Sequence, residues 1–274
     1  MTMIINNNIA AMNSYRNLTS VNESVDKTME KLSSGLRINK AGDDAAGLAI
    51  SEKMRGQVKG LNMATKNAQN GISMIQTAEG ALNETHAIIQ RMRELAIQAA
   101  NDTNTKEDRE KLQLEGKQLV EELNRIAETT EFNTRTLLDG EFKKKGLSFH
   151  IGANKDQGVE LGFGDMKAKN LGVEKFDITD AKKANTTIDK VNGALEKVSS
   201  ERAKLGATQN RLEHTINNLR VSSENLQAAE SRIRDADMAN EMVSLNKNRI
   251  ISQAGTAMLA QANTAPQSVL QLLG

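Results

Sequence analysis

Apolar residues recur at every seventh position over two long segments of the chain. The first series is Met54, Leu61, Ala68, Ile75, Leu82, Ile89 and Ala96. The second series is Val191, Val198, Leu205, Leu212, Leu219, Leu226 and Ile233. Because seven residues make almost two turns of an α-helix, each series forms one narrow apolar line along a helix. Each line is about 63 Å long, which is typical of a rod or a fibre subunit rather than of a compact enzyme domain.

Several polar residues mark where these helices begin. Asp43 or Asp44 can cap the helix that carries the first series, because a carboxylate accepts hydrogen bonds from the free N–H groups of the first turn. Thr105 and Asp108 have the spacing of a capping box, and a shorter apolar stripe follows them. We therefore predict core helices over 54–100, 105–128 and 184–235.

The flanks of the two series predict how these helices pack. On the first helix, the apolar flank changes sides near Ile75, which indicates a change of neighbour there. On the second helix, polar residues occupy one flank at Arg202, Gln209, Ser223 and Glu230, so a parallel zipper dimer would be poorly sealed. An intramolecular bundle closes the two apolar lines better, because the connections place these helices as antiparallel neighbours within one chain. We predict a mainly α protein, a long antiparallel helical bundle or coiled coil with a small β-hairpin region at its outer end.

The hairpin is predicted in residues 130–183, where the seven-residue period is lost and all five phenylalanines lie. Apolar residues alternate at Leu147, Phe149 and Ile151, and again at Val159, Leu161 and Phe163. Alternation of this kind on both sides of a glycine-containing loop indicates two antiparallel strands.

The two ends of the chain, 1–34 and 236–274, are apolar enough to form helices but have only each other to pack on. We expect them to associate with partner molecules and to become ordered during assembly. The expected organisation is therefore an N-terminal helix and linker over 1–42, two core helices over 43–129, the hairpin region over 130–183, a third core helix over 184–235 and a C-terminal helix over 236–274.

Composition narrows the class of protein. The 274 residues include no Cys, no Trp, one Tyr and one Pro, so aliphatic helix faces must supply the core, and no disulfide or thiolate metal site is possible. The formal net charge of +1 lacks the basic excess that nucleic-acid binding requires. The N-terminus lacks the pattern of a cleavable signal peptide, and we expect no membrane span.

No pattern in the chain predicts catalysis. His86, His150 and His214 are far apart, and none belongs to the His-Glu-x-x-His arrangement that places two metal ligands on one helix turn. The glycines at 35, 42 and 47 do not form a phosphate-binding loop, because no Gly-Lys-Ser/Thr follows them. We expect no catalytic residues, no metal site and no cofactor.

Several long motifs resemble one family. They are SSGLRINKAGDDAAGLAISEKMRGQ (33–57), QRMRELAIQAAN (90–101), RAKLGATQNRLEHTINNL (202–219), AESRIRDADMANEM (229–242) and QANTAPQSVLQLLG (261–274). Together, in this order, they resemble bacterial flagellins. Residues 130–183 are too short for the variable outer domains of that family, so the chain resembles a minimal, core-only flagellin.

The resemblance implies a subunit that polymerises into the bacterial flagellar filament for swimming motility, with the terminal helices lining the inner tube. An open, non-closing head-to-tail contact is sufficient for such a polymer. It also implies export through the growing flagellum to the cell exterior, and as partners an export chaperone and export apparatus, the filament cap and hook-associated proteins. The alternatives are a hook-associated junction protein, which would join but not propagate, and a cytosolic coiled-coil adaptor; an enzyme ranks behind both.

Three sets of site residues follow. Arg91 and Leu95 lie four apart on a helix face turned away from the Ile89 line, so we expect both to be exposed. The resemblance implies that these two residues and Glu115 form the contact recognised by a vertebrate Toll-like receptor; an ordinary exposed leucine and a packing contact between filament subunits are the alternatives. The core line is assigned to Leu61, Ile75, Leu82, Ile89, Leu205, Leu212, Leu219 and Leu226. Polymerisation is assigned to Ile5, Ile9, Leu18, Val25, Leu32, Met258, Leu259, Val269, Leu270 and Leu273.

Overall fold

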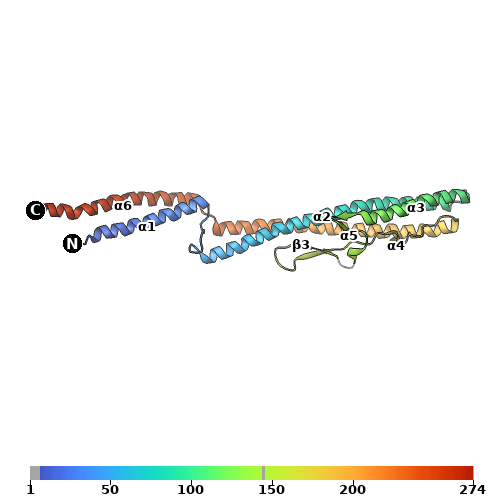
Figure 1. The fold of residues 1–274 in the computed structure, drawn as a ribbon, viewed down its shortest axis with the longest axis horizontal. Coiled ribbons are helices and arrows are strands. Elements are labelled where there is room, and N and C mark those ends of the chain that lie inside the picture. Colours follow the sequence, from blue (N-terminus) through green and yellow to red (C-terminus); the bar gives the residue numbers. More distant parts are fainter. Residues whose placement is uncertain (1–6, 144–145, 274) are drawn as a thin grey trace. The chain divides into compact units, whose positions relative to one another are not determined.

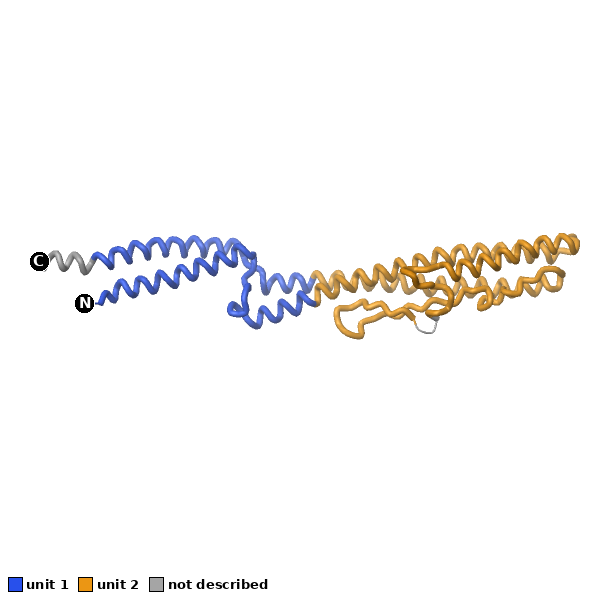
Figure 2. The backbone as a smooth tube through the Cα atoms, in the orientation of Figure 1, with its two compact units in different colours: residues 1–56, 225–274 blue, residues 57–224 orange. Residues whose placement is uncertain are grey.

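The computed structural model describes residues 7–143 and 146–273 (Figure 1). Six α-helices carry most of the chain: α1 (Ile9–Ser34), α2 (Ala45–Ala100), α3 (Lys106–Thr129), α4 (Ala168–Leu171), α5 (Ala181–Arg234) and α6 (Met238–Leu273). Between α3 and α4 lie β1 (Glu131–Phe132), β2 (Arg135–Thr136), the 3-10 turn η1 (Glu141–Lys143), β3 (Leu147–His150) and β4 (Gly158–Leu161). The chain divides into two compact units, 57–224 and 1–56 with 225–274 (Figure 2). This architecture confirms the predicted mainly α fold.

The predicted helix starts are confirmed at two positions. Asp44 immediately precedes α2, and its Oδ1 accepts a hydrogen bond from the backbone N–H of Gly47 at 2.8 Å. Thr105 and Asp108 form a complete capping box at the start of α3, because each side chain accepts a hydrogen bond from the backbone N–H of the other. These local contacts satisfy N–H groups that have no partner within the helix.

In the unit of residues 57–224, α2 runs antiparallel to α5. Polar contacts fix the register: Asn62 contacts Ser223, Glu79 pairs with Arg202, and Arg93 donates to Asn192, so the partner number falls as the α2 number rises. The residues of the two seven-residue series face each other in this unit, where Ala68, Ile75, Leu82, Ile89, Ala96, Val191, Val198, Leu205 and Leu212 are almost fully buried. The polar flank of α5 is thus matched by polar residues of α2.

The neighbour of α2 changes near Ile75, as predicted. Before that point the β3–β4 hairpin lies against the helix: Asn67 donates to the carbonyl of His150 at 2.9 Å, and Gly71 lies against the ring of Phe149. Beyond Ile75, α3 is the neighbour of α2: the Arg109 guanidinium of α3 donates to the carbonyl of Ala99 at 2.9 Å. Gly60 and Gly71 of α2 have no side chain, so the hairpin can approach the helix closely at both positions.

The two strands of the hairpin are antiparallel, as predicted. Leu147 lies opposite Leu161 and Phe149 opposite Val159 in an antiparallel ladder. It lies along the side of the bundle against α2, rather than at the outer end where we expected it. Phe149 packs against the helix backbone there, and this burial is available only beside the helix.

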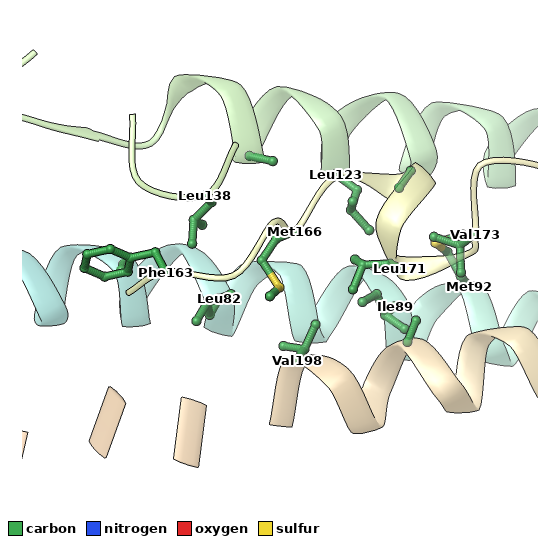
Figure 3. Packing of buried hydrophobic residues seen from close by; sticks show 14 of the residues in the cluster. Leu82, Ile89, Met92, Leu123, Leu138, Phe163, Met166, Leu171, Val173 and Val198 are labelled. Atoms are coloured by element: carbon green, nitrogen blue, oxygen red, sulfur yellow. The ribbon is translucent and has the colours of Figure 1, made fainter. Parts of the chain in front are cut away.

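A segment that the helical period could not predict returns from the hairpin between α3 and α5. Met166, Leu171 and Val173 of this segment are buried in the main core, together with Leu123 of α3 and Ile89 of α2 (Figure 3). Phe176 and Ile178 are buried in the same cluster. The side chain of Gln113 in α3 holds it by donating to the carbonyl of Phe176 at 2.5 Å and accepting from the N–H of Ile178 at 2.8 Å. Residues 163–178 therefore complete the core of this unit.

In the other unit, α1 runs antiparallel to α6. Asn22 accepts from Ser252 at 2.9 Å, and Lys31 pairs with Glu241 at 3.4 Å. The linkers beside these helices are joined by two backbone hydrogen bonds, from Arg37 N to Arg234 O at 2.7 Å and from Ala236 N to Gly35 O at 2.9 Å. Gly35 ends α1 with a φ of 70°, a left-handed conformation that glycine adopts without strain.

Leu226 of the second series lies in this unit and is only half-buried. Here α5 lies against the first turns of α2, where Arg55 pairs with Glu230 at 2.8 Å and Arg234 with Glu52 at 3.2 Å. None of the helices within 7–143 and 146–273 is long and apolar enough to cross a membrane.

Candidate functional site

The α1–α6 pair carries an exposed apolar surface. Large apolar side chains stand in water on both helices, and the described ones are Ile9, Met12, Tyr15, Met29, Met238, Met242, Val243, Ile250, Ile251 and Met258. By contrast, the only buried residue of α1 is Thr28. A pair of helices that leaves this much apolar area in water is typical of an element that is covered by other molecules. We call these ten residues the α1–α6 surface.

The residues assigned to polymerisation from the sequence divide into three groups. Leu18, Val25, Leu32 and Leu259 are half-buried, and Leu18 packs over Gly255 of α6. Ile9 and Met258 are exposed and belong to the α1–α6 surface. Ile5 lies outside the described residues, and the structure does not describe the side chains of Val269, Leu270 and Leu273. The half-buried group therefore holds α1 and α6 together within one chain.

Sequence reasoning missed most of the α1–α6 surface. It named Ile9 and Met258, but its other described residues on α1, Leu18, Val25 and Leu32, stand at seven-residue spacing. Met12 and Tyr15 lie three and six residues after Ile9 on a different face of α1 and were not named. A count of apolar positions around the whole helix would have found this second face. A helix with two apolar faces can bury only one of them against a single neighbour.

A second candidate surface lies where α2 meets α3. Arg91 of α2 donates from Nε to Glu115 Oε1 of α3 at 2.8 Å, and from Nη1 to Glu94 Oε2 at 3.0 Å. These hydrogen bonds, first to Glu115 and then to Glu94, raise the pKa of Arg91 above its ordinary value. All three side chains are substantially exposed. The result is a charged cluster on the surface with its guanidinium held in a defined orientation.

The expectation that Leu95 is exposed beside Arg91 is wrong. Leu95 is 0% exposed and belongs to the same core cluster as Met92 and Ala99. In this stretch α2 is covered by α3 as well as by α5, so its buried arc is wider than the line through Ile89 and Ala96. A second neighbour buries residues that a single apolar line places on the outside. Arg91 and Glu115 are thus brought together at the surface, and Leu95 lies in the core.

The position of Glu115 depends on the core beneath α3. Gln113 and Gly116 flank it in sequence; Gln113 holds the backbone of residues 176 and 178, and Gly116 lies against the Phe176 ring. This turn of α3 is therefore anchored on its inner side, which leaves Glu115 free to face Arg91. Rigid support of this kind is what keeps a surface residue pre-organised for a partner.

The described residues contain no cluster of three or more His, Asp or Glu side chains that could hold a metal ion. The three histidines belong to separate places: His86 contacts Gln90 on α2, His150 ends β3, and His214 lies on α5. The two features that stand out among the described residues are therefore surfaces: the apolar one on α1–α6 and the charged Arg91 cluster.

Comparison with solved structures agrees with this fold. A putative flagellar hook-associated protein from Vibrio parahaemolyticus superposes with a TM-score of 0.59 over 70% of this chain and 100% of that chain. Its sequence is 12% identical, so the similarity concerns the arrangement of helices alone.

Sequence comparison is more specific. The flagellin of Halalkalibacterium halodurans is 56% identical over 273 residues, covering 99% of this chain and all of the relative. The flagellin of Bacillus subtilis is 55% identical, and the flagellar filament 33 kDa core protein of Treponema phagedenis is 54% identical, each over 99% of this chain. Residues 5–143 match the bacterial flagellin N-terminal helical region, and residues 188–273 match the C-terminal helical region. The chain therefore belongs to the bacterial flagellin family.

Proposed function

We propose that this chain polymerises into the bacterial flagellar filament through the α1–α6 surface. The exposed apolar area on α1 and α6 is the observation that carries the proposal. Membership of a structural family supports the role of filament subunit and offers no support for an enzyme. The division into helical ends and a separate bundle follows from burial, because only the bundle encloses its apolar residues.

A matched pair of valine substitutions tests which surface drives polymerisation. Val243 on α6 is 68% exposed and Val221 on α5 is 57% exposed, so Val→Glu removes little internal packing at either site. Burial of a carboxylate without a partner opposes assembly strongly, and we expect Val243→Glu to raise the critical concentration for polymerisation by at least about tenfold. Val221→Glu should change it far less.

The assay is light scattering and electron microscopy after addition of ammonium sulfate, a salt that favours apolar burial. Circular dichroism of both variants before salt addition checks that each chain is as helical as the wild type. If the Val243 variant forms filaments at the wild-type concentration, the α1–α6 surface is not the polymerisation surface. If wild type itself forms no filaments, the proposed function fails as a whole.

We also propose that the free monomer is recognised by a vertebrate Toll-like receptor through Arg91 and Glu115. The 2.8 Å hydrogen bond between them supports this, since it fixes the guanidinium at the surface next to an exposed carboxylate. Leu95 is fully buried, so it supports the site from below and is not itself part of the contact. From membership of the family alone, we propose two further interactions. A flagellar chaperone and the export apparatus export the chain, and the assembled chain contacts the cap and hook-associated proteins.

The receptor proposal is tested by titrating the receptor ectodomain with purified monomer. We expect Arg91→Ala to weaken binding by roughly tenfold, the size typical of a buried arginine contact. Arg125→Ala is the control, because Arg125 is another exposed arginine that pairs with a carboxylate, Glu122, away from the cluster. Equal binding by wild type and both variants would remove Arg91 from the contact. If Leu95→Ala weakens receptor binding, it should also lower the melting temperature of the chain, because Leu95 lies in the core.

A further inference from the structure

The α1–α6 surface is rich in methionine. Five of its ten residues are methionines with exposed fractions of 46–64%: Met12, Met29, Met238, Met242 and Met258. The methionines of the bundle core, Met74, Met92 and Met166, are at most 7% exposed. Oxidation of a thioether requires access of the oxidant to sulfur, so the chain separates reactive methionines from protected ones.

We propose that these five methionines are oxidation sites for hydrogen peroxide, and that their oxidation in the free subunit blocks filament assembly. The proposal rests on the proposed polymerisation through the α1–α6 surface. It adds a chemical control to that surface, because methionine sulfoxide can be reduced again by methionine sulfoxide reductases. The block is therefore reversible.

The chemistry at each site is a two-electron oxygen transfer. A lone pair of Sδ attacks one peroxide oxygen, an S–O bond forms and the O–O bond breaks. A proton passes to the departing oxygen, which leaves as water. The sulfur is oxidised by two electrons and the peroxide is reduced by two, so no further co-reactant is needed. The product replaces a flexible apolar side chain with a polar, chiral one.

The effect on assembly follows from burial. In the free subunit a sulfoxide oxygen at these positions is hydrated, because the side chains stand in water. In a contact between subunits the sulfoxide oxygen would lose that water without gaining a hydrogen-bond donor. Such a group raises the critical concentration by about ten- to hundredfold for each site buried.

Met29 differs from the other four. The Nη2 of Arg249 lies 4.0 Å from the Met29 Sδ, so a hydrogen-bond donor is already beside this sulfur. A sulfoxide oxygen at Met29 can accept from that guanidinium, and we expect Met29 to contribute least. Met12 and Met258 are the most exposed of the five and should contribute most.

The test compares four forms of the full-length chain: wild type, a variant with all five methionines replaced by leucine, Met29→Leu and Met63→Leu. Leucine conserves volume and apolar character but cannot be oxidised. Met63 is 54% exposed on α2, outside the α1–α6 surface, so Met63→Leu is the matched control. Each form is treated with hydrogen peroxide, oxygen uptake is mapped by peptide mass spectrometry, and assembly is measured before and after treatment.

We expect peroxide to abolish assembly of wild type, Met29→Leu and Met63→Leu. The variant with all five methionines replaced by leucine, called the fivefold variant, should still assemble after the treatment. Treatment with methionine sulfoxide reductase should restore the wild type. The helical content of treated monomers should be unchanged, since Met74, Met92 and Met166 stay protected. In preformed filaments the five methionines should oxidise more slowly than in monomers.

Two results would overturn the inference: full assembly of wild type with sulfoxide at these five sites, or equal peroxide sensitivity in the fivefold variant. Met1 and Met3 are retained in every form, so a block that they carried would appear as the second result. Failure of untreated wild type to assemble is a different outcome, because it removes the proposed polymerisation itself.

Discussion

The ring of Phe176 lies against the backbone of Gly116 in α3, in the space that a Cβ at this position would occupy. One turn earlier, Gln113 bonds the carbonyl of Phe176 and the N–H of Ile178. These contacts attach residues 163–178 to the inner face of α3, directly beneath the turn that carries Glu115. The charged surface of the Arg91 cluster therefore depends on the packing of a segment far away in the sequence.

The space around each glycine predicts whether replacing it by alanine lowers or raises the free energy of unfolding. Gly116→Ala should lower the free energy of unfolding by about 1–3 kcal/mol, because the added methyl group must displace the Phe176 ring. Gly80 of α2 has nothing within 4 Å of the position of a Cβ, so Gly80→Ala should raise it by about 0.5–1 kcal/mol through helix propensity. Urea denaturation followed by circular dichroism measures both. Stabilisation by the Gly116 substitution would contradict the packing of Phe176 described above.

The core line predicts the cost of truncating Leu212. This residue of α5 is 1% exposed and faces α2 near Gly71, so Leu212→Ala should lower the free energy of unfolding by about 2–5 kcal/mol. Leu114→Ala is a control on α3, where the side chain is exposed, and it should change stability by no more than about 0.5 kcal/mol. An unchanged melting temperature for the Leu212 variant would show that this residue is not part of the core.

The ion pair of Asp177 predicts a change in stability at acid pH. Its hydrogen bonds, first to Lys183 and then to Thr179, lower the pKa of Asp177 from 3.8 to about 2. Because the pKa is lower in the folded chain, the pair contributes its stability above about pH 4 and loses it as the pH falls from there toward 2. Both side chains are about half exposed, so the contribution should be no more than about 1 kcal/mol.

Carboxyl NMR titration of Asp177 checks this. Lys183→Met should raise the pKa of Asp177 toward its ordinary value, since it removes the main hydrogen-bond donor. Lys190→Met is the control, because Lys190 lies one seven-residue repeat further along α5. A pKa near 2 in the Lys183 variant would show that Thr179 and the backbone, not Lys183, account for the shift.

Removal of the C-terminal helix should separate folding from assembly. Deletion of residues 236–274 takes away α6 but none of the residues of the unit formed by 57–224. We expect the truncated chain to keep a cooperative thermal transition and to remain monomeric in ammonium sulfate, while the full chain forms filaments under the same conditions. Filaments of the truncated chain, seen by electron microscopy, would refute the assignment of polymerisation to the terminal helices.

The sequence by itself determined the elements that depend on local contacts and on a regular period. Helix starts at Asp44 and Thr105 follow from capping, which involves residues three apart. The antiparallel bundle follows from two apolar lines that can be closed within one chain, and the hairpin follows from alternation in Leu147–Ile151 and Val159–Phe163. The resemblance placed Arg91 and Glu115 in one contact surface, but the hydrogen bond between them was not predicted, because no local pattern links two separate helices.

Only the tertiary structure decided which apolar residues are inside. Leu95 lies off the Ile89 line and still belongs to the core, because α3 covers a second side of α2. Residues 163–178 have no regular period, yet they fill the space between α3 and α5, where Gly116 makes room for Phe176. The opposite holds for α1 and α6, whose second apolar faces stay in water because each helix has one neighbour. Burial depends on the number of neighbours around a helix, and a single sequence period cannot report that number.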